Sequence, residues 1–269
     1  MSKLEELKQL RKDVNLIVNN LDYYPRNEIN VLVSNHNCLM DIFYLPMSLP
    51  EEIISLISAR LVYKNENDRK DVVNRYLHAM PIEAHGGSKY ANICLEQAIK
   101  FLQHGKSVNI YPEGAYVPDK KVFRGHTGAS RIVFNARKLG KNVNLIPISI
   151  NVSKDCDLDD YNKKGANVVV TILPAIDYED SYYNYRYVTK KEERNELLHQ
   201  PIDIAMKCIA NNLGIPYVND YIELRTKGNV MFGDGSIVDV NTAQEEEFVK
   251  RYDQELNDRT LRLIKNIKY

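Results

Sequence analysis

Short runs of β-branched and aliphatic residues alternate with longer amphipathic segments, and this alternation restricts the possible fold more than any other feature of the chain. Strands are predicted at 31–33, 107–111, 143–152, where Pro147 interrupts the pattern, and 166–173. Helices are predicted at 88–102, 128–139 and 192–213, the last with a break near Pro201. The alternation favours an α/β fold, a single domain with a mixed, largely parallel sheet covered by helices on both faces.

The two ends of the chain have their own patterns. Apolar residues recur at three- and four-residue steps between Leu4 and Leu21, which predicts an N-terminal amphipathic helix within residues 1–27. Its polar face mixes acidic and basic residues and so favours packing on the core, although a transient membrane contact stays open. At the other end, a Gly- and Asp-rich loop at 229–241 is expected before a charged helix at 242–265. The expected division is thus an N-terminal helix (1–27), a central domain (28–216) and a C-terminal helical extension (217–269) packed on that domain.

The balance of charges argues against some partners. Lys plus Arg and Asp plus Glu both number 36, so the net charge is zero and no global basic field would recruit nucleic acid. No window approaches 18 consecutive apolar residues, and the N-terminus lacks the layout of a secretory signal. We therefore expect a cytoplasmic protein, with peripheral attachment to the inner face of the membrane as the open alternative. The four cysteines are widely spaced, which indicates neither a zinc site nor a disulfide framework, and no metal site is expected.

His36 and Asp41 come directly after the predicted strand 31–33, in the sequence Ser-Asn-His-Asn-Cys-Leu-Met-Asp. A strand that ends in this way delivers a histidine to its exposed end, and the residues after it are typical of the first turn of a helix. Five positions separate the two residues, too many for one face of a continuous helix, but a bend at Asn37 would let the carboxylate reach the ring. The pair would then be a base and the group that orients it.

A second strand end also carries polar chemistry. The apolar run at 108–111 leads into Pro112-Glu113-Gly114, a turn marked by Pro and Gly that contains a carboxylate. Either motif alone arises easily by chance. Two of them at the ends of predicted strands indicate a common site.

In this order the motifs resemble those of the glycerolipid acyltransferases, the family typified by lysophosphatidate acyltransferase. The resemblance rests on Asn35-His36 with Asp41, then Tyr111-Pro112-Glu113-Gly114, then the apolar segment 145–150. Between the last two, Phe123-Arg124 and the following segment 126–132 are similar to the family's basic-aromatic segment and the helix after it. The similarity extends over residues 28–215, and the motifs are specific only as a set.

The resemblance implies transfer of a fatty acyl group from acyl-CoA or acyl carrier protein, used as co-substrate without any other cofactor, to a hydroxyl of a lysolipid such as lysophosphatidate. It implies that His36 is the general base and Asp41 its orienting group. The residues that it places at the substrate are Asn35, Glu113, Gly114, Arg124 and His126. Acyl carrier protein is thereby a candidate partner.

Two departures from the family pattern concern the acceptor. Ala115-Tyr116-Val117 stand where the family commonly has Thr-Arg-Ser, and Ala84 stands near the place of a second arginine. Two interpretations follow: the acceptor is an amine or a molecule without phosphate, or other cations hold the phosphate. Those cations are Arg60, Lys120, Lys121 and Arg124. A third alternative is a non-catalytic lipid-binding protein.

The segment 178–187 contains five tyrosines. They would either line an acyl or acceptor cleft or pack one side of a loop against the sheet, and the second interpretation is favoured because their hydroxyls would then stay hydrated.

Overall fold

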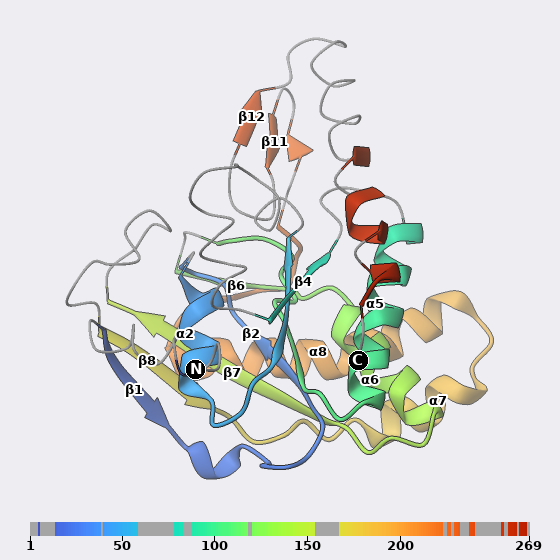
Figure 1. Cartoon of the computed structure of the whole chain (residues 1–269), viewed down its shortest axis with the longest axis horizontal. Coiled ribbons are helices and arrows are strands. Elements are labelled where there is room, and N and C mark those ends of the chain that lie inside the picture. The colour runs from blue at the N-terminus through green and yellow to red at the C-terminus, as the bar shows by residue number, and fades with distance from the viewer. Residues whose placement is uncertain are drawn as a thin grey trace.

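The computed structural model of the chain (Figure 1) describes most of the sequence. The described residues are Glu5, 14–38, 40–58, 78–82, 88–117, 120–153, 167–222, 225–226, 229–231, 237–239, 254–255, 258–262 and 264–267. Within them, no helix combines the length and the apolar character needed to cross a membrane.

A seven-stranded sheet forms the centre of this part of the molecule. In spatial order its strands are β1 (Asn15–Asn19), β8 (Asn167–Ile172), β7 (Asn144–Val152), β2 (Asn30–Ser34), β5 (Val108–Ile110), β3 (Ile54–Ser58) and β4 (His78–Ile82). Neighbouring strands are parallel except for the antiparallel pair of β7 and β8. The predicted mixed, largely parallel sheet is therefore confirmed.

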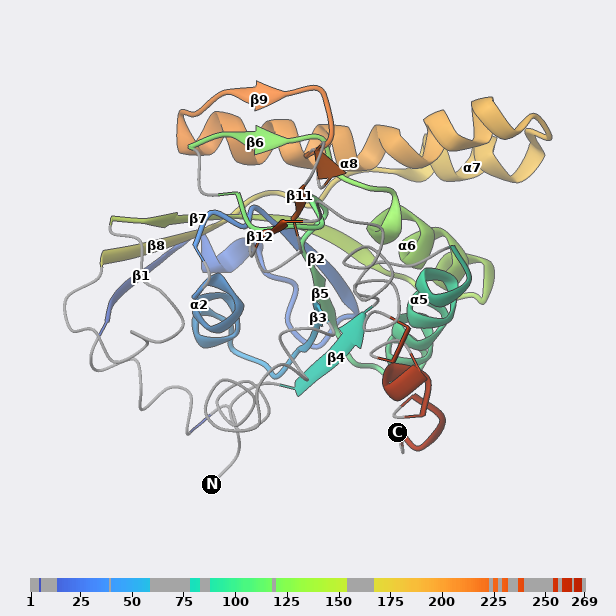
Figure 2. The same cartoon turned by 90° about the horizontal axis from the view of Figure 1, so that it is seen from above.

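Helices cover both faces of the sheet (Figure 2). One face carries α2 (Asp41–Ser48), and the other carries α5 (Ser88–Gln103), α6 (Gly128–Lys138) and α8 (Lys191–Leu213). Side chains alternate along β2, so Val31 and Val33 join the core on the α6 and α8 side while Leu32 joins the core around α2. A strand that is buried on both faces consists of a continuous run of apolar residues, and such a run allows β2 to be predicted from the sequence.

The sequence predicts an interruption at Pro147 and a break near Pro201, but the strand and the helix that contain them are both continuous. Pro147 lies inside β7, and its carbonyl accepts a hydrogen bond from the N–H of Leu173 at 3.0 Å. The β7–β8 register begins one residue later, at Ile148, so Pro147 lies at the end of that ladder, while on the other side it stays in register with Val33 of β2. Pro201 is buried within the continuous helix α8, whose packing on β7 outweighs the lost helical bond.

The predicted N-terminal helix is wrong for residues 15–19. They form β1, which pairs in parallel with β8 and turns Leu16 toward the core, while Ile17 stays 47% exposed. A short 3-10 turn, Leu21–Tyr23, follows. Pairing with β8 therefore overrides the helical spacing of the apolar residues. The segments 1–4 and 6–13 of the predicted helix lie outside the described residues.

The tyrosine-rich segment is a helix, α7 (Glu179–Tyr187), where the sequence predicts a loop. The rings of Tyr178, Tyr182 and Tyr185 lie 6.1, 5.5 and 5.3 Å from the ring of Phe134 on α6. They therefore pack on a neighbouring helix. Figure 2 shows α7 on the side of the molecule away from α2.

The C-terminal extension is not wholly helical. The predicted loop at 229–241 contains β11 (Asn229–Met231) and β12 (Ile237–Asp239), which form a small antiparallel sheet with β10 (Arg225–Thr226). Of the helix expected at 242–265, residues 254–255, 258–262 and 264–265 are described and helical. Ile264 and Ile267 pack against the core on the α5 side, so this end of the chain contacts the same domain.

Candidate active site

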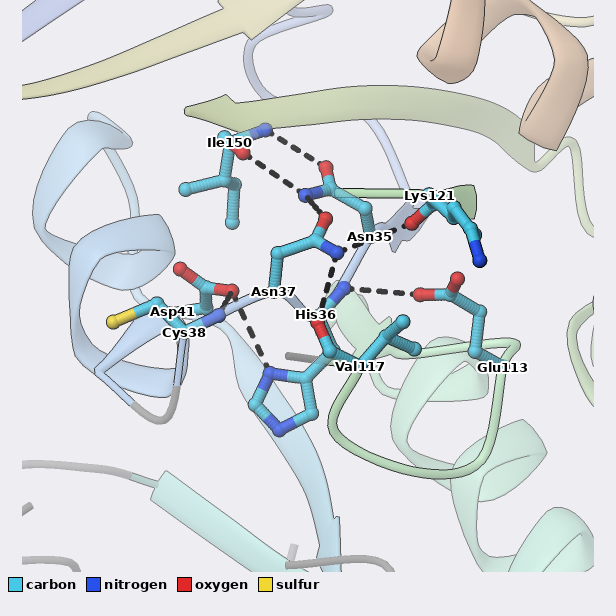
Figure 3. A network of polar contacts seen from close by, with 9 residues as sticks. All are labelled: Asn35, His36, Asn37, Cys38, Asp41, Glu113, Val117, Lys121 and Ile150. Atoms are coloured by element: carbon cyan, nitrogen blue, oxygen red, sulfur yellow. Dashed lines mark hydrogen bonds and ion pairs between the residues drawn. The ribbon is translucent and has the colours of Figure 1, made fainter. Parts of the chain in front are cut away.

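The histidine and the aspartate predicted as a pair do meet at the carboxyl end of β2. The chain bends between β2 and α2, and the Nδ1 atom of His36 lies 3.5 Å from Oδ2 of Asp41. The same carboxylate oxygen accepts the backbone N–H of Cys38 at 2.9 Å, which fixes Asp41 in the first turn of α2. Figure 3 shows the other ring nitrogen of His36 pointing away from Asp41. Nε2 is therefore the ring nitrogen that Asp41 does not contact.

Burial raises the pKa of the Asp41 carboxyl, and the neighbouring His36 imidazole and the Cys38 amide oppose the rise. Only 1% of Asp41 and 5% of His36 is exposed to solvent. In such surroundings a charge on the carboxylate interacts strongly with the ring, because water screens it poorly. The pair is suited to stabilise an imidazolium when the ring takes up a proton.

Asn35 and Asn37 hold the histidine segment in place (Figure 3). The Asn35 amide donates to the carbonyl of Ile150 and accepts the N–H of the same residue, both at 2.9 Å. Asn37 donates to the carbonyls of Val117 and Lys121 at 3.0 and 3.1 Å. Asn35 is fully buried, so its geometry supports a positioning role more than the predicted contact with substrate.

Glu113 also binds backbone. Its Oε2 accepts the N–H of His36 at 3.1 Å, and its Oε1 accepts the N–H of Phe123 at 2.8 Å. Burial raises the pKa of this carboxyl from 4.5 to about 7, against the lowering effect of the two amides. Since only 1% of Glu113 is exposed, its geometry favours holding the site together over the predicted contact with the acceptor.

The raised pKa of Glu113 predicts a dependence of stability on pH. Between pH 4.5 and about 7 the unfolded chain has lost the proton that the folded chain keeps, so the free energy of unfolding falls as the pH rises through this window. A shift of this size corresponds to about 3 kcal/mol. Glu113→Gln removes this titration, so the stability advantage of the native protein over the variant should shrink from pH 4.5 to 7. Urea unfolding across that range measures it, and a constant difference would contradict the prediction.

The other three predicted substrate residues lie on the loops around this centre. Gly114 is exposed and has a φ of 76°, a left-handed conformation that favours glycine. Nε and Nη2 of Arg124 donate hydrogen bonds to the two carboxylate oxygens of Asp203 on α8, at 3.1 and 2.9 Å. The exposed ring of His126 is stacked on Tyr221, with centroids 4.8 Å apart. Arg124 thus already has an anionic partner.

The other cations that the sequence offers to a phosphate are Lys120, Lys121 and Arg60, and Ala84 marks a departure from the family pattern. Lys120 and Lys121 are exposed on the segment before β6 (Val122–Phe123), whereas Arg60 and Ala84 lie outside the described residues. Among described residues, no three His, Cys, Asp or Glu side chains gather as a metal site would require.

Sequence reasoning missed the aromatic neighbours of His36. The ring of Tyr111 lies 4.6 Å from the imidazole, and the ring of Tyr116 lies 5.8 Å away, nearly perpendicular to it. Tyr111 directly follows β5, and this position was the available signal, because a residue there lies at the same sheet edge as His36. Tyr116 stands where the family pattern has an arginine, and no local signal marks its contact with the ring.

Comparisons with known proteins concern the family and the fold of the chain. The model of the family described as Acyltransferase matches residues 15–151. Among solved structures, the 1-acyl-sn-glycerophosphate (LPA) acyltransferase PlsC from Thermotoga maritima is similar in fold, with a TM-score of 0.50 over 76% of this chain and 78% of that one. Sequence identity to it is 17%, so this likeness concerns the fold. No curated protein matches the chain.

Proposed function

Since this chain belongs to the acyltransferase family, we propose that it moves a fatty acyl group from an acyl thioester to a hydroxyl of a lysolipid such as lysophosphatidate. The donor would be acyl-CoA or acyl carrier protein. One observation carries the proposal: the imidazole of His36 is paired through Nδ1 with a buried carboxylate, and its other nitrogen points away from that carboxylate. This arrangement suits a general base.

In the proposed reaction, Nε2 of His36 takes the proton of the acceptor hydroxyl while the oxygen attacks the carbonyl carbon of the thioester. Asp41 holds the Nδ1–H tautomer and stabilises the imidazolium that forms. The tetrahedral adduct then collapses, the carbon–sulfur bond breaks, and the imidazolium returns its proton to the leaving thiolate. Atoms and charges balance without a covalent acyl-enzyme, because the acceptor itself is the nucleophile.

The groups around the base would act through it. Asn35 and Glu113 hold the backbone of the histidine segment from two sides, which limits how far the ring can drift from the attacking oxygen. Gly114 and His126 are exposed near the Glu113 turn, where they would contact the acceptor.

A second candidate acceptor is a neutral alcohol or an amine. The favouring observation is that Arg124, one of the cations that would have to replace the arginines missing from the family pattern, is neutralised by two contacts with Asp203. Lys120 and Lys121 are exposed on the segment before β6 and, with Arg60, are the remaining candidates to supply positive charge for a phosphorylated acceptor.

The test is thiol release from acyl-CoA and from acyl carrier protein thioesters, each offered with lysophosphatidate, a neutral monoacylglycerol and a long-chain amine. Release that depends on lysophosphatidate supports the first candidate, and release that depends only on the neutral alcohol or the amine supports the second. No acceptor-dependent release from any donor would contradict both.

A further inference from the structure

Residues 216–221 follow α8 and lie against β6. In this segment β9 (Tyr217–Val218) pairs with β6 in parallel, with Tyr217 opposite Val122. Backbone hydrogen bonds continue the contact on either side, from the N–H of Val122 to the carbonyl of Pro216 at 2.9 Å and from the N–H of Arg124 to the carbonyl of Asp220 at 3.0 Å. Figure 2 shows the two strands side by side along α8. The position of β6 is therefore fixed by residues beyond the part of the chain that the family model matches.

β6 in turn is connected to the backbone of His36 through the side chain of Glu113. The N–H of Phe123 on β6 donates to one oxygen of Glu113, and the N–H of His36 donates to the other. Because Glu113 is buried, water does not compete for these bonds. Both bonds end on the same planar group, so we expect a displacement of β6 to disturb the bond to the backbone of His36 as well.

The ring of Tyr221 packs on His126, which lies next to the Glu113 turn. The two rings are stacked at 4.8 Å with an angle of 6° between their planes, and the Tyr221 hydroxyl lies 3.0 Å from Nε2 of His199 on α8. The imidazole of His126 also lies against Gly114, where an added Cβ would come within 3.1 Å of its Cδ2 atom. Tyr221 thus supports His126 next to the turn that carries Glu113.

Gly125 shows how closely this segment fits. A Cβ added at Gly125 would lie 2.5 Å from Cγ2 of Ile202 on α8 and 2.7 Å from Cβ of Pro112. Such distances are far shorter than normal carbon–carbon contacts. The backbone after β6 is therefore in direct contact with α8 and with the Glu113 turn.

Asp203 adds a second attachment to α8. Its carboxylate accepts two bonds from the guanidinium of Arg124 and one from the hydroxyl of Tyr217 at 3.2 Å. Bidentate geometry fixes orientation as well as distance. Tyr217 belongs to β9 and Arg124 directly follows β6, so Asp203 attaches both sides of the β6–β9 pair to the helix.

We propose that Tyr221 is a positioning residue for His36, because residues 217–221 hold β6 and His126 against the Glu113 turn, and Glu113 fixes the backbone of the base. The inference rests on the proposed function for its effect on catalysis. Its structural content, that a change at Tyr221 moves His36, does not depend on that function.

The test compares Tyr221→Ala with Tyr221→Phe, which keeps the ring stacked on His126. Loss of the ring is expected to lower kcat by about 10- to 100-fold with a smaller change in KM, because a misplaced base weakens the chemical step more than substrate binding. Tyr221→Phe should keep most of the native kcat. Tyr183→Ala, which removes a 60% exposed tyrosine of α7, is the matched control and should leave kcat at the native value.

A second readout is independent of activity. Nitrogen-15 spectra of the histidine rings report on His36, whose signals are identified by their loss in His36→Ala. We expect these signals to shift in Tyr221→Ala and to stay in place in Tyr183→Ala. If Tyr221→Ala fails to fold, Tyr221→Leu, which keeps apolar volume without the stacked ring, is measured in the same way.

Unshifted His36 signals in a folded variant without the ring would overturn the inference, even if the enzyme is active. Absence of acceptor-dependent thiol release from the native protein would instead overturn the proposed function, while a shift of the His36 signals would still support the positional link. The two failures are thereby distinguished.

Discussion

Replacing His36 by alanine is expected to lower acceptor-dependent thiol release by about 100- to 10,000-fold, the usual contribution of a positioned general base. Neither buried carboxylate nearby is placed to take over. Asp41 is held by the amide of Cys38, and both oxygens of Glu113 accept backbone N–H groups. The loss should appear in kcat at saturating acceptor, because the proton transfer belongs to the transition state.

The matched control is His104→Ala, which removes an exposed histidine that follows α5 and contacts the carbonyl of Lys100. This variant should retain native kcat. Thermal unfolding must show that His36→Ala is folded, since the lost ring packs on Tyr111. A folded His36→Ala variant with native kcat would rule out His36 as the base.

Elements whose local pattern and tertiary surroundings agree could be predicted from the sequence. Val168, Val170 and Ile172 of β8 are all buried, as their β-branched run indicates, and α5 and α6 begin and end within one residue of the predicted limits. β1 could not be predicted in this way. The spacing of its apolar residues is helical, and only the pairing of Leu16 with Val168, far along the chain, makes it a strand.

The contacts of the candidate site likewise divide into those that could be predicted from the sequence and those that could not. His36 and Asp41 lie close together in sequence, so their contact could be predicted from the bend between a strand and a helix. The partners of Glu113 and Arg124 could not. Glu113 binds the amide of His36 and Arg124 binds Asp203, contacts across 77 and 79 residues that leave no local trace in the sequence. The family motif predicts a substrate contact for Glu113 and Arg124, while these long-range contacts favour a structural role.

Asp41 should give the second large effect, and its two substitutions separate orientation from charge. Asp41→Ala removes the acceptor of the Cys38 amide and the partner of His36 together, and we expect kcat to fall by about 100-fold or more because the imidazole loses its fixed tautomer and the stabilisation of its charged form. Asp41→Asn can keep an oxygen toward Cys38 and Nδ1 while losing the negative charge. Its kcat should lie between those of the native protein and Asp41→Ala.

Asp41→Asn should lower kcat without lowering the unfolding temperature. Burial raises the pKa of Asp41, so the ionised carboxylate costs folding free energy at neutral pH, and this cost disappears as the pH falls through the raised pKa. Asp41→Asn carries no charge and should therefore unfold at pH 7 at a temperature no lower than that of the native protein, although it is a poorer catalyst. Thermal unfolding and kcat measured on the same samples decide the matter. An Asp41→Asn variant with native kcat but a lowered unfolding temperature would mean that the carboxylate holds the bend between β2 and α2 and contributes nothing to the proton transfer.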